Sequence, residues 1–294
     1  MAKQYEFSSK GLPYLLVLPQ MLVVFVFFFW PAAQAVFQSF FLQDPFGGRM
    51  IFVGAENYTT LFKDPTYWAS FGRSFLYAGL VAFSAMAMAL FLAVQANKQI
   101  RGASFYKTML IWPYAVATMV AGVLWIFMFN PNIGVVAYFL KHSLGVEWNH
   151  LLNAGQAFLL VTIAAAWKQV AYNFVFFLAG LQSVPAALVE AAAIDGAGPT
   201  KRFWTIVFPL LSPTTFYLLV MNVVYGFFET FPIIHQATQG GPGQATNILV
   251  YKVWRDGVVN LDLGGSSAQS VVLMILVIGL TVVQFRFIER KVTY

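Results

Sequence analysis

Two groups of polar residues interrupt stretches of the chain that are otherwise apolar, and their types suit the binding of a charged solute. Lys168 lies about eleven residues into the apolar run 157–181, which is about 16 Å along an α-helix and close to the middle of a bilayer. An ammonium group at this depth is costly against lipid, so we expect it to face a bundle interior or a wet pathway, where it would attract an anion. The alternatives are a structural pairing with a backbone carbonyl or with an acid of another subunit, or a position nearer the interface.

A second polar group recurs with helical spacing further along the chain. Asn222, Tyr225 and Glu229 follow one another at separations of three and four residues, which places their side chains on one face of a helix. Such a stripe inside a membrane indicates either a cavity or hydrogen bonds between helices. Glu229 would repel a phosphate and lies near the external end of its helix, so its role stays open. The candidate substrate pathway comprises Lys168, Asn173, Asn222, Tyr225 and Glu229.

Residue patterns for catalysis or metal binding do not stand out. There are no cysteines, and His142, His150 and His235 have spacings unrelated to those of metal ligands. We find neither a carboxylate pair, a nucleophile next to a base, nor the glycine-rich P-loop that holds ATP phosphates. We therefore expect a non-catalytic chain with no metal and no cofactor of its own, whose energy comes from elsewhere.

The elements that would position these polar residues are membrane spans. The chain is 60% hydrophobic, only 10% charged, and has a mean hydropathy of +0.71, which excludes a soluble domain. A helix needs about 20 apolar residues to cross the hydrocarbon core, and six runs meet this length. The predicted spans are 12–40, 74–97, 108–130, 157–181, 207–230 and 266–287. This predicts an all-α integral membrane protein with a single domain, 1–294.

The run 231–251 is also uncharged, but its proline and glycines make it a poor helix, so we exclude it as a span. Three segments are then external: 41–72, 131–156 and 231–265. With both termini in the cytoplasm, ten Lys and Arg residues lie inside and six outside, which agrees with the positive-inside rule. The net charge of +6 thus reflects topology, and no clustered basic surface indicates nucleic-acid binding.

A polar cytoplasmic segment, 183–206, lies between the fourth and fifth spans. The motif that begins in this segment continues into the start of the fifth span. Glu-Ala-Ala is followed after three residues by Gly196, after nine more by Ile206, and shortly afterwards by Pro209. This spacing resembles the coupling loop of ABC-importer permeases, in which such a loop contacts the ATPase subunit. Phe208 stands where that family usually has Leu. By this resemblance, the ATPase-coupling residues are Glu190, Ala191, Ala192, Asp195, Gly196, Ile206 and Pro209.

Local rules also predict a short helix in this segment. Ser183 can cap it, Pro185 suits its first turn, and Gly196 and Gly198 can take the positive φ values that end it. Alanines at 191–193 give it a surface of small residues, so a groove of another protein can approach closely. An ordinary solvated connection between two spans is the alternative.

Two external motifs extend the resemblance to the carbohydrate-uptake branch of this family. The run 52–58, Phe-Val-Gly-Ala-Glu-Asn-Tyr, is similar to its Phe-Val-Gly-x-x-Asn-Tyr signature, and Gly240-Gly241-Pro242 with Thr246 is similar to its Gly-Gly-Pro loop. Runs throughout the chain, among them Trp167-Lys168-Gln169, resemble the permeases of glycerol 3-phosphate importers.

The resemblance implies the ABC importer type I permease fold, the bacterial inner membrane and a set of partners. These are a second permease in a heterodimer, two copies of an ATPase subunit that bind ATP and Mg²⁺, and a periplasmic binding protein. The implied cargo is sn-glycerol 3-phosphate or glycerophosphodiesters, with a related sugar or polyol as the alternative.

Two other classes of function are weaker. An ion-coupled secondary transporter usually has more spans, internal repeats and mid-membrane acids, and a membrane enzyme would need a catalytic constellation. We expect alternating access driven by ATP hydrolysis on the partner subunit.

Overall fold

The computed structural model describes residues 11–44, 48–98 and 102–288. Its contacts divide the chain into two compact units, Met1–Asp64 with Val253–Val272, and Pro65–Lys252 with Leu273–Tyr294. The two chain ends, predicted to be cytoplasmic, lie outside the described residues.

The first unit contains a long apolar helix followed by a small hairpin. The helix runs unbroken over Leu12–Gln38, as α1 (Leu12–Val24), a π-helical stretch (Phe25–Phe29) and α2 (Trp30–Gln38). Strands β1 (Phe41–Gln43) and β2 (Met50–Phe52) then pair antiparallel, with Phe41 opposite Phe52, and α3 spans Glu56–Lys63. The unit also holds a π-helical stretch (Arg255–Val259) and the start of α15 (Leu263–Val283). The short hairpin is an exception to the predicted all-α fold.

The signature run 52–58 shapes this unit. Gly54 has φ +59°, a value that favours glycine, and it turns the chain from β2 towards α3. The Asn57 amide donates to the carbonyls of Ser39 (2.8 Å) and Phe41 (3.1 Å), and the Tyr58 hydroxyl donates to the Ser39 hydroxyl at 2.7 Å. Asn57 and Tyr58 therefore connect α3 to the end of α2 by hydrogen bonds.

The second unit is built around two long helices, α4 (Pro65–Ala96) and α8 (Ala154–Ser183), which pack along their length. Three alanines on α4, Ala85, Ala89 and Ala93, are completely buried. Small residues let the helix backbones approach closely, which is the usual basis of packing between membrane helices. Both helices extend beyond the predicted spans, α4 by nine residues at its start.

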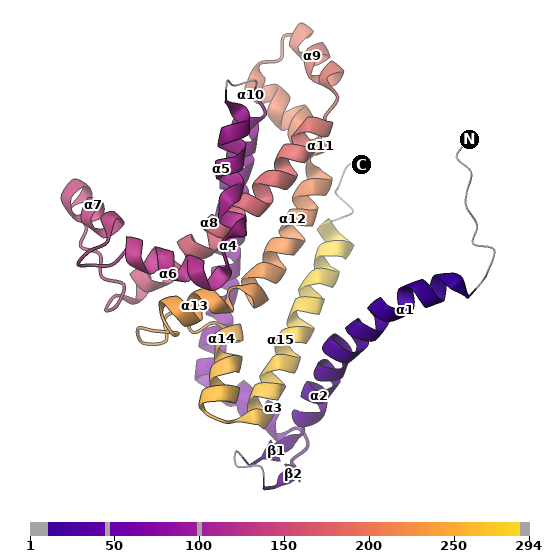
Figure 1. Ribbon diagram of the computed structural model, residues 1–294, viewed down its shortest axis with the longest axis vertical. Helices are drawn as coiled ribbons and strands as arrows, with labels where there is room; N and C mark the ends of the chain where they lie inside the picture. Colours follow the sequence, from indigo (N-terminus) through magenta and orange to yellow (C-terminus); the bar gives the residue numbers. More distant parts are fainter. Residues whose placement is uncertain (1–10, 45–47, 99–101, 289–294) are drawn as a thin grey trace. The chain divides into compact units, whose positions relative to one another are not determined.

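The predicted third span is not one straight helix. It consists of α5 (Ala103–Ala115) and α6 (Thr118–Met128), which are bent by 105° (Figure 1). Val116 and Ala117 are extended at the break, three residues after Pro113. The apolar run 108–130 suggested a continuous span because hydropathy carries no information on the direction of a helix.

The predicted fifth span is bent as well. The helical segment Pro199–Leu210 turns by 67° at Leu211 into Ser212–Glu229. The first part comprises α10 (Pro199–Arg202), a π-helical stretch (Phe203–Val207) and α11 (Phe208–Leu210). The second comprises α12 (Ser212–Val224) and a π-helical stretch (Tyr225–Glu229).

Other helices are short. They are α7 (Val135–Leu144), α9 (Ala186–Ile194), α13 (Phe231–Ala237) and α14 (Leu249–Trp254), with a final π-helical stretch, Gln284–Ile288. The run 231–251 thus has a helix at each end, and its centre, 238–248, is not helical. Four described helices are long and apolar enough to cross a membrane, or up to six if each bent pair is one span.

Candidate functional site

The predicted coupling segment forms an exposed helix between α8 and the bend that leads to α12. Helix α9 begins after Pro185, which is its N-cap rather than part of its first turn. The prediction that Ser183 caps this helix is wrong, because Ser183 is the last residue of α8 and its hydroxyl donates to the Gly180 carbonyl at 2.8 Å. Figure 1 shows α9 at the tip of the hairpin that α8 and α12 form.

Gly196 ends α9 as predicted. Its φ is +81°, the Ala197 N–H donates to the Ala192 carbonyl at 2.9 Å, and the Gly196 N–H donates to the Ala193 carbonyl at 3.1 Å. These two bonds form a Schellman motif, in which the residue with positive φ is normally glycine. The same prediction for Gly198 is wrong: its φ is −66° and its ψ 162°, the extended conformation that a following proline favours.

The surface of α9 is apolar and exposed. Ile194 is 86% exposed and Leu188 48%, while Glu190 and Asp195 are also at the surface. The contact of α9 with an ATPase subunit stays a prediction. Of the other predicted coupling residues, Ala191 is exposed and Ala192, Ile206 and Pro209 are half-buried, with Ile206 and Pro209 lying in the helical return towards α12.

Lys168 is half-buried and bonds to the broken end of α5. Its Nζ donates to the Val116 carbonyl at 2.7 Å and to the Tyr114 carbonyl at 3.3 Å, and it lies 5.7 Å from the centre of the Tyr114 ring. These carbonyls lie where the helix ends and so lack intrahelical partners, and the C-terminal end of a helix attracts a cation. The carbonyl pairing that the sequence left as an alternative is therefore present.

Three tyrosines form a group beside Lys168 that the sequence analysis missed. The hydroxyls of Tyr172 and Tyr217 share a hydrogen bond at 2.8 Å, and the Tyr114 ring stacks on that of Tyr172 with centres 5.9 Å apart. Tyr114 is 57% exposed and Tyr217 41%. Tyr172 lies four residues after Lys168, so helical spacing was a signal for it. The other two come from α5 and α12, and no sequence signal brings them here.

The remaining candidate pathway residues have different surroundings. Asn173 and Asn222 are completely buried and bond to each other through both amides, at 3.2 and 2.8 Å. Tyr225 is buried and its hydroxyl donates to the Ala165 carbonyl at 3.4 Å, whereas Glu229 is exposed. Hydrogen bonds between helices, one of the two readings of this stripe, thus account for the buried members. A role in the substrate pathway stays a prediction.

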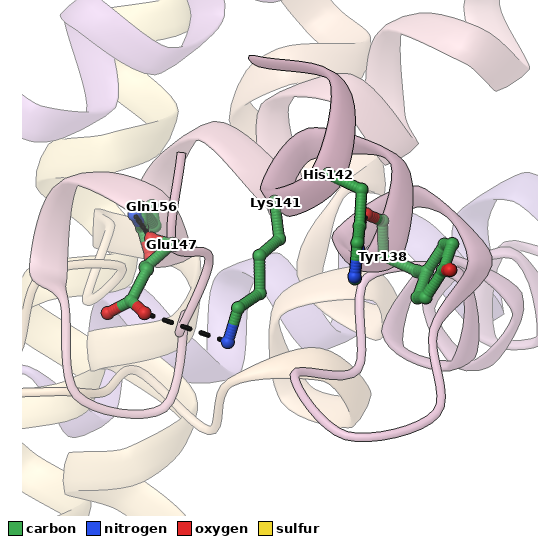
Figure 2. Close-up of polar contacts among 5 residues, drawn as sticks. All are labelled: Tyr138, Lys141, His142, Glu147 and Gln156. Atoms are coloured by element: carbon green, nitrogen blue, oxygen red, sulfur yellow. Dashed lines mark hydrogen bonds and ion pairs between the residues drawn. The ribbon is translucent and has the colours of Figure 1, made fainter. Parts of the chain in front are cut away.

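The segment 131–156 folds around α7. Figure 2 shows Lys141 reaching Glu147 across the loop, with Nζ and Oε1 3.7 Å apart. Both side chains are well exposed, so this pair contributes little to stability.

Nearby, the Trp148 indole donates to His150 Nδ1 at 3.3 Å, and burial lowers the pKa of His150, an effect that the backbone of Phe129 opposes. A neutral His150 suits this contact, since Nδ1 accepts the bond.

The Gly-Gly-Pro loop folds back on itself. Gly240 has φ +80°, and a Cβ there would collide with the Tyr251 ring, so this position requires glycine. The Thr246 hydroxyl bonds to the Gly241 carbonyl at 3.1 Å and lies 2.6 Å from the Thr238 hydroxyl. The motif thus fixes the shape of this loop.

Comparisons with known proteins agree with this geometry. Residues 85–294 match the family described as binding-protein-dependent transport system inner membrane component. The chain belongs to this family. The permease is 57% identical over 288 residues to the sn-glycerol-3-phosphate transport system permease protein UgpA of Rhizobium meliloti (strain 1021), covering 98% of each chain. It is also 57% identical to the UgpA of Brucella suis biovar 1 (strain 1330) over 292 residues, 99% of each chain.

These matches confirm the predicted resemblance to permeases of glycerol 3-phosphate importers. Among solved structures, a bacterial alginate ABC transporter in complex with an alginate-bound periplasmic protein contains a chain that superposes with a TM-score of 0.79 at 19% identity, covering 93% of the permease and 92% of that chain. At this identity the likeness shows the fold alone. The permease therefore has the fold of an ABC-importer membrane subunit.

Proposed function

We propose that this permease is the membrane subunit of an ATP-driven importer whose cargo is sn-glycerol 3-phosphate or a glycerophosphodiester. The observation that carries the proposal is the full-length identity of 57% to permeases named for that cargo. Lys168 supports it, because a positive charge next to three tyrosines suits an anionic polyol phosphate.

The finer architecture is part of the proposal. Each bent helix pair counts as one span, which gives the six spans of the type I importer permease fold, with both termini in the cytoplasm of a bacterium and the chain in its inner membrane. One such permease and a second permease subunit form a heterodimer that binds two ATPase subunits and a periplasmic binding protein. ATP and Mg²⁺ bind to the ATPase subunits, and no cofactor or metal binds to this chain.

The mechanism follows from the position of α9. ATP-driven closure of the ATPase subunits displaces the exposed helix that docks on them, and this displacement reaches the membrane through α8 and α12, between which α9 lies. The cargo-facing side of the pathway contains Lys168 and the tyrosines, so the negative charge of the cargo meets an ammonium group.

Reconstitution tests the cargo. In proteoliposomes that hold both permeases and the ATPase, we expect labelled sn-glycerol 3-phosphate to accumulate only when ATP is inside and the binding protein is outside. Uptake that continues without ATP or without the binding protein would point instead to an ion-coupled transporter. Preferential uptake of an uncharged sugar would contradict the cargo assignment.

Orientation can be measured with single cysteines, because the chain has none of its own. We expect Thr200→Cys, exposed beyond α9, to react with a membrane-impermeant maleimide only after the cells are opened. Glu147→Cys, at a position 84% exposed, should react in intact cells. Labelling of Thr200→Cys from outside would overturn the six-span topology.

A further inference from the structure

Helices α8 and α12 flank the coupling segment and approach each other closely at its base. A Cβ placed on Gly180 would lie 2.9 Å from Leu211 Cδ2 and 3.5 Å from Thr214 Cβ. Glycine at this position therefore lets the two backbones meet immediately before the chain leaves for α9. This close contact lies at the end of α8, where a displacement of the coupling segment would first be passed to the long helices.

Besides the Tyr172–Tyr217 bond, a buried polar link joins the two helices, the Asn173–Asn222 pair. Each amide nitrogen donates to the other residue's carbonyl oxygen, at 3.2 and 2.8 Å, and Asn222 Nδ2 also reaches the Leu218 carbonyl at 2.7 Å. Both side chains are 0% exposed, so no water replaces these bonds. Sliding one helix along the other would leave buried amides without partners, which is strongly unfavourable.

A third link lies further from the coupling segment. The Tyr225 hydroxyl, in the π-helical continuation of α12, donates to the Ala165 carbonyl of α8 at 3.4 Å. Helix α8 thus contacts α12 and its π-helical continuation at three levels: next to the coupling segment, at the asparagine pair, and further still from the coupling segment at Tyr225. Close packing together with paired buried amides favours a single arrangement of the helix pair.

We propose that Asn173 and Asn222 are positioning residues that lock α8 and α12 into one rigid body, so that displacement of α9 moves both helices together. The inference rests on the proposed coupling function of α9. It also reassigns the two asparagines, because fully buried amides that satisfy each other do not offer a surface to cargo.

A disulfide tests whether the two helices move together. A Cβ built on Gly180 lies 3.5 Å from Thr214 Cβ, which fits disulfide geometry, and the chain has no other cysteine. Leu211 Cδ2, which that Cβ approaches to 2.9 Å, is the far end of a flexible side chain and can move aside. In the reconstituted complex we expect Gly180→Cys/Thr214→Cys to transport equally well, within about twofold, when reduced and when oxidised. The single cysteine variants control for effects of the oxidant. Transport that stops on oxidation and returns with reductant would overturn the proposal, since the helices would then have to separate in each cycle.

Substitution of the asparagine pair tests its role in coupling. Replacing both partners by apolar residues leaves no unsatisfied amide, so Asn173→Leu/Asn222→Leu should assemble better than either single variant. We expect ATPase activity stimulated by the binding protein to persist, while cargo moved per ATP hydrolysed falls at least about fivefold, the lower range of allosteric coupling. Thr162→Val is the matched control: Thr162 is a buried polar residue of α8, and among the described residues its hydroxyl bonds within its own helix, to the Phe158 carbonyl.

Other outcomes have distinct meanings. Cargo per ATP within twofold of the parent would overturn the proposal, and a raised KM with unchanged cargo per ATP would make the asparagines cargo contacts instead. If the double Leu variant does not assemble, the oxidised cysteine pair decides alone. The disulfide readout compares the oxidised with the reduced form of one variant, and the asparagine readout compares a variant with the parent. Failure of the parent to move glycerol 3-phosphate would therefore refute the cargo assignment and not the rigid pair.

Discussion

Gly196→Val should abolish most transport by releasing the ATPase subunit, although position 196 touches nothing that a larger side chain would strike. Gly196 has φ +81°, and apart from its chain neighbours no atom of the described residues lies within 4 Å of a Cβ built there, so the cost arises in the backbone alone. A left-handed conformation costs an L-residue about 1–2 kcal/mol, and β-branched side chains tolerate it least. Since 1.4 kcal/mol is a factor of ten in an equilibrium, we expect binding of the ATPase to the permease to weaken about tenfold.

The neighbouring glycine supplies a matched control. Gly198 is equally unobstructed but extended, with φ −66°, so Gly198→Val should keep ATPase binding and uptake near those of the parent. Gly196→Asn should fall between the two, because Asn enters the left-handed region more easily than Val. ATPase retained by purified complexes and uptake in proteoliposomes measure these effects. Normal association of the Gly196→Val permease would mean that the α9 turn does not position the docking surface.

Lys168→Met should lower uptake of glycerol 3-phosphate at least about tenfold at matched complex abundance, through the loss of a charge and of two hydrogen bonds. The ammonium group now bonds to the carbonyls of Tyr114 and Val116, and hydrogen bonds to charged groups contribute about 1.5–3 kcal/mol each. Met suits an apolar span, so the chain should still fold, but the break between α5 and α6 loses its cation. Lys168→Arg keeps the charge and the donors and should preserve more activity.

The charge of the cargo separates the two roles of Lys168. A phosphate monoester carries more negative charge near neutral pH than a diester, so direct electrostatic contact predicts a larger loss for glycerol 3-phosphate than for a glycerophosphodiester. A purely structural role predicts equal losses for both. Uptake by Lys168→Met equal to that of the parent would exclude both, and would move the search to the tyrosines or to the partner permease.

Some features of this permease were readable from the sequence because they depend only on neighbours in the chain. A Schellman turn needs a residue with positive φ directly after the helix, so the position of Gly196 predicted the end of α9. Hydropathy likewise located the helices, since crossing hydrocarbon requires length and apolar composition and little else. The predictions failed for Ser183, because α8 continues through it, and for Gly198, which is extended as a residue before a proline usually is.

The site itself was decided by tertiary structure. Lys168 stood out in the sequence, but its partners are carbonyls 52 and 54 residues earlier, which are free only because α5 ends and α6 turns away by 105°. Asn173 meets Asn222, and Tyr172 meets Tyr217, only because α8 and α12 return alongside each other after the coupling segment. Helical spacing defines which face of one helix a side chain occupies, whereas the direction of a bend and the partner across it depend on packing between segments distant in the chain.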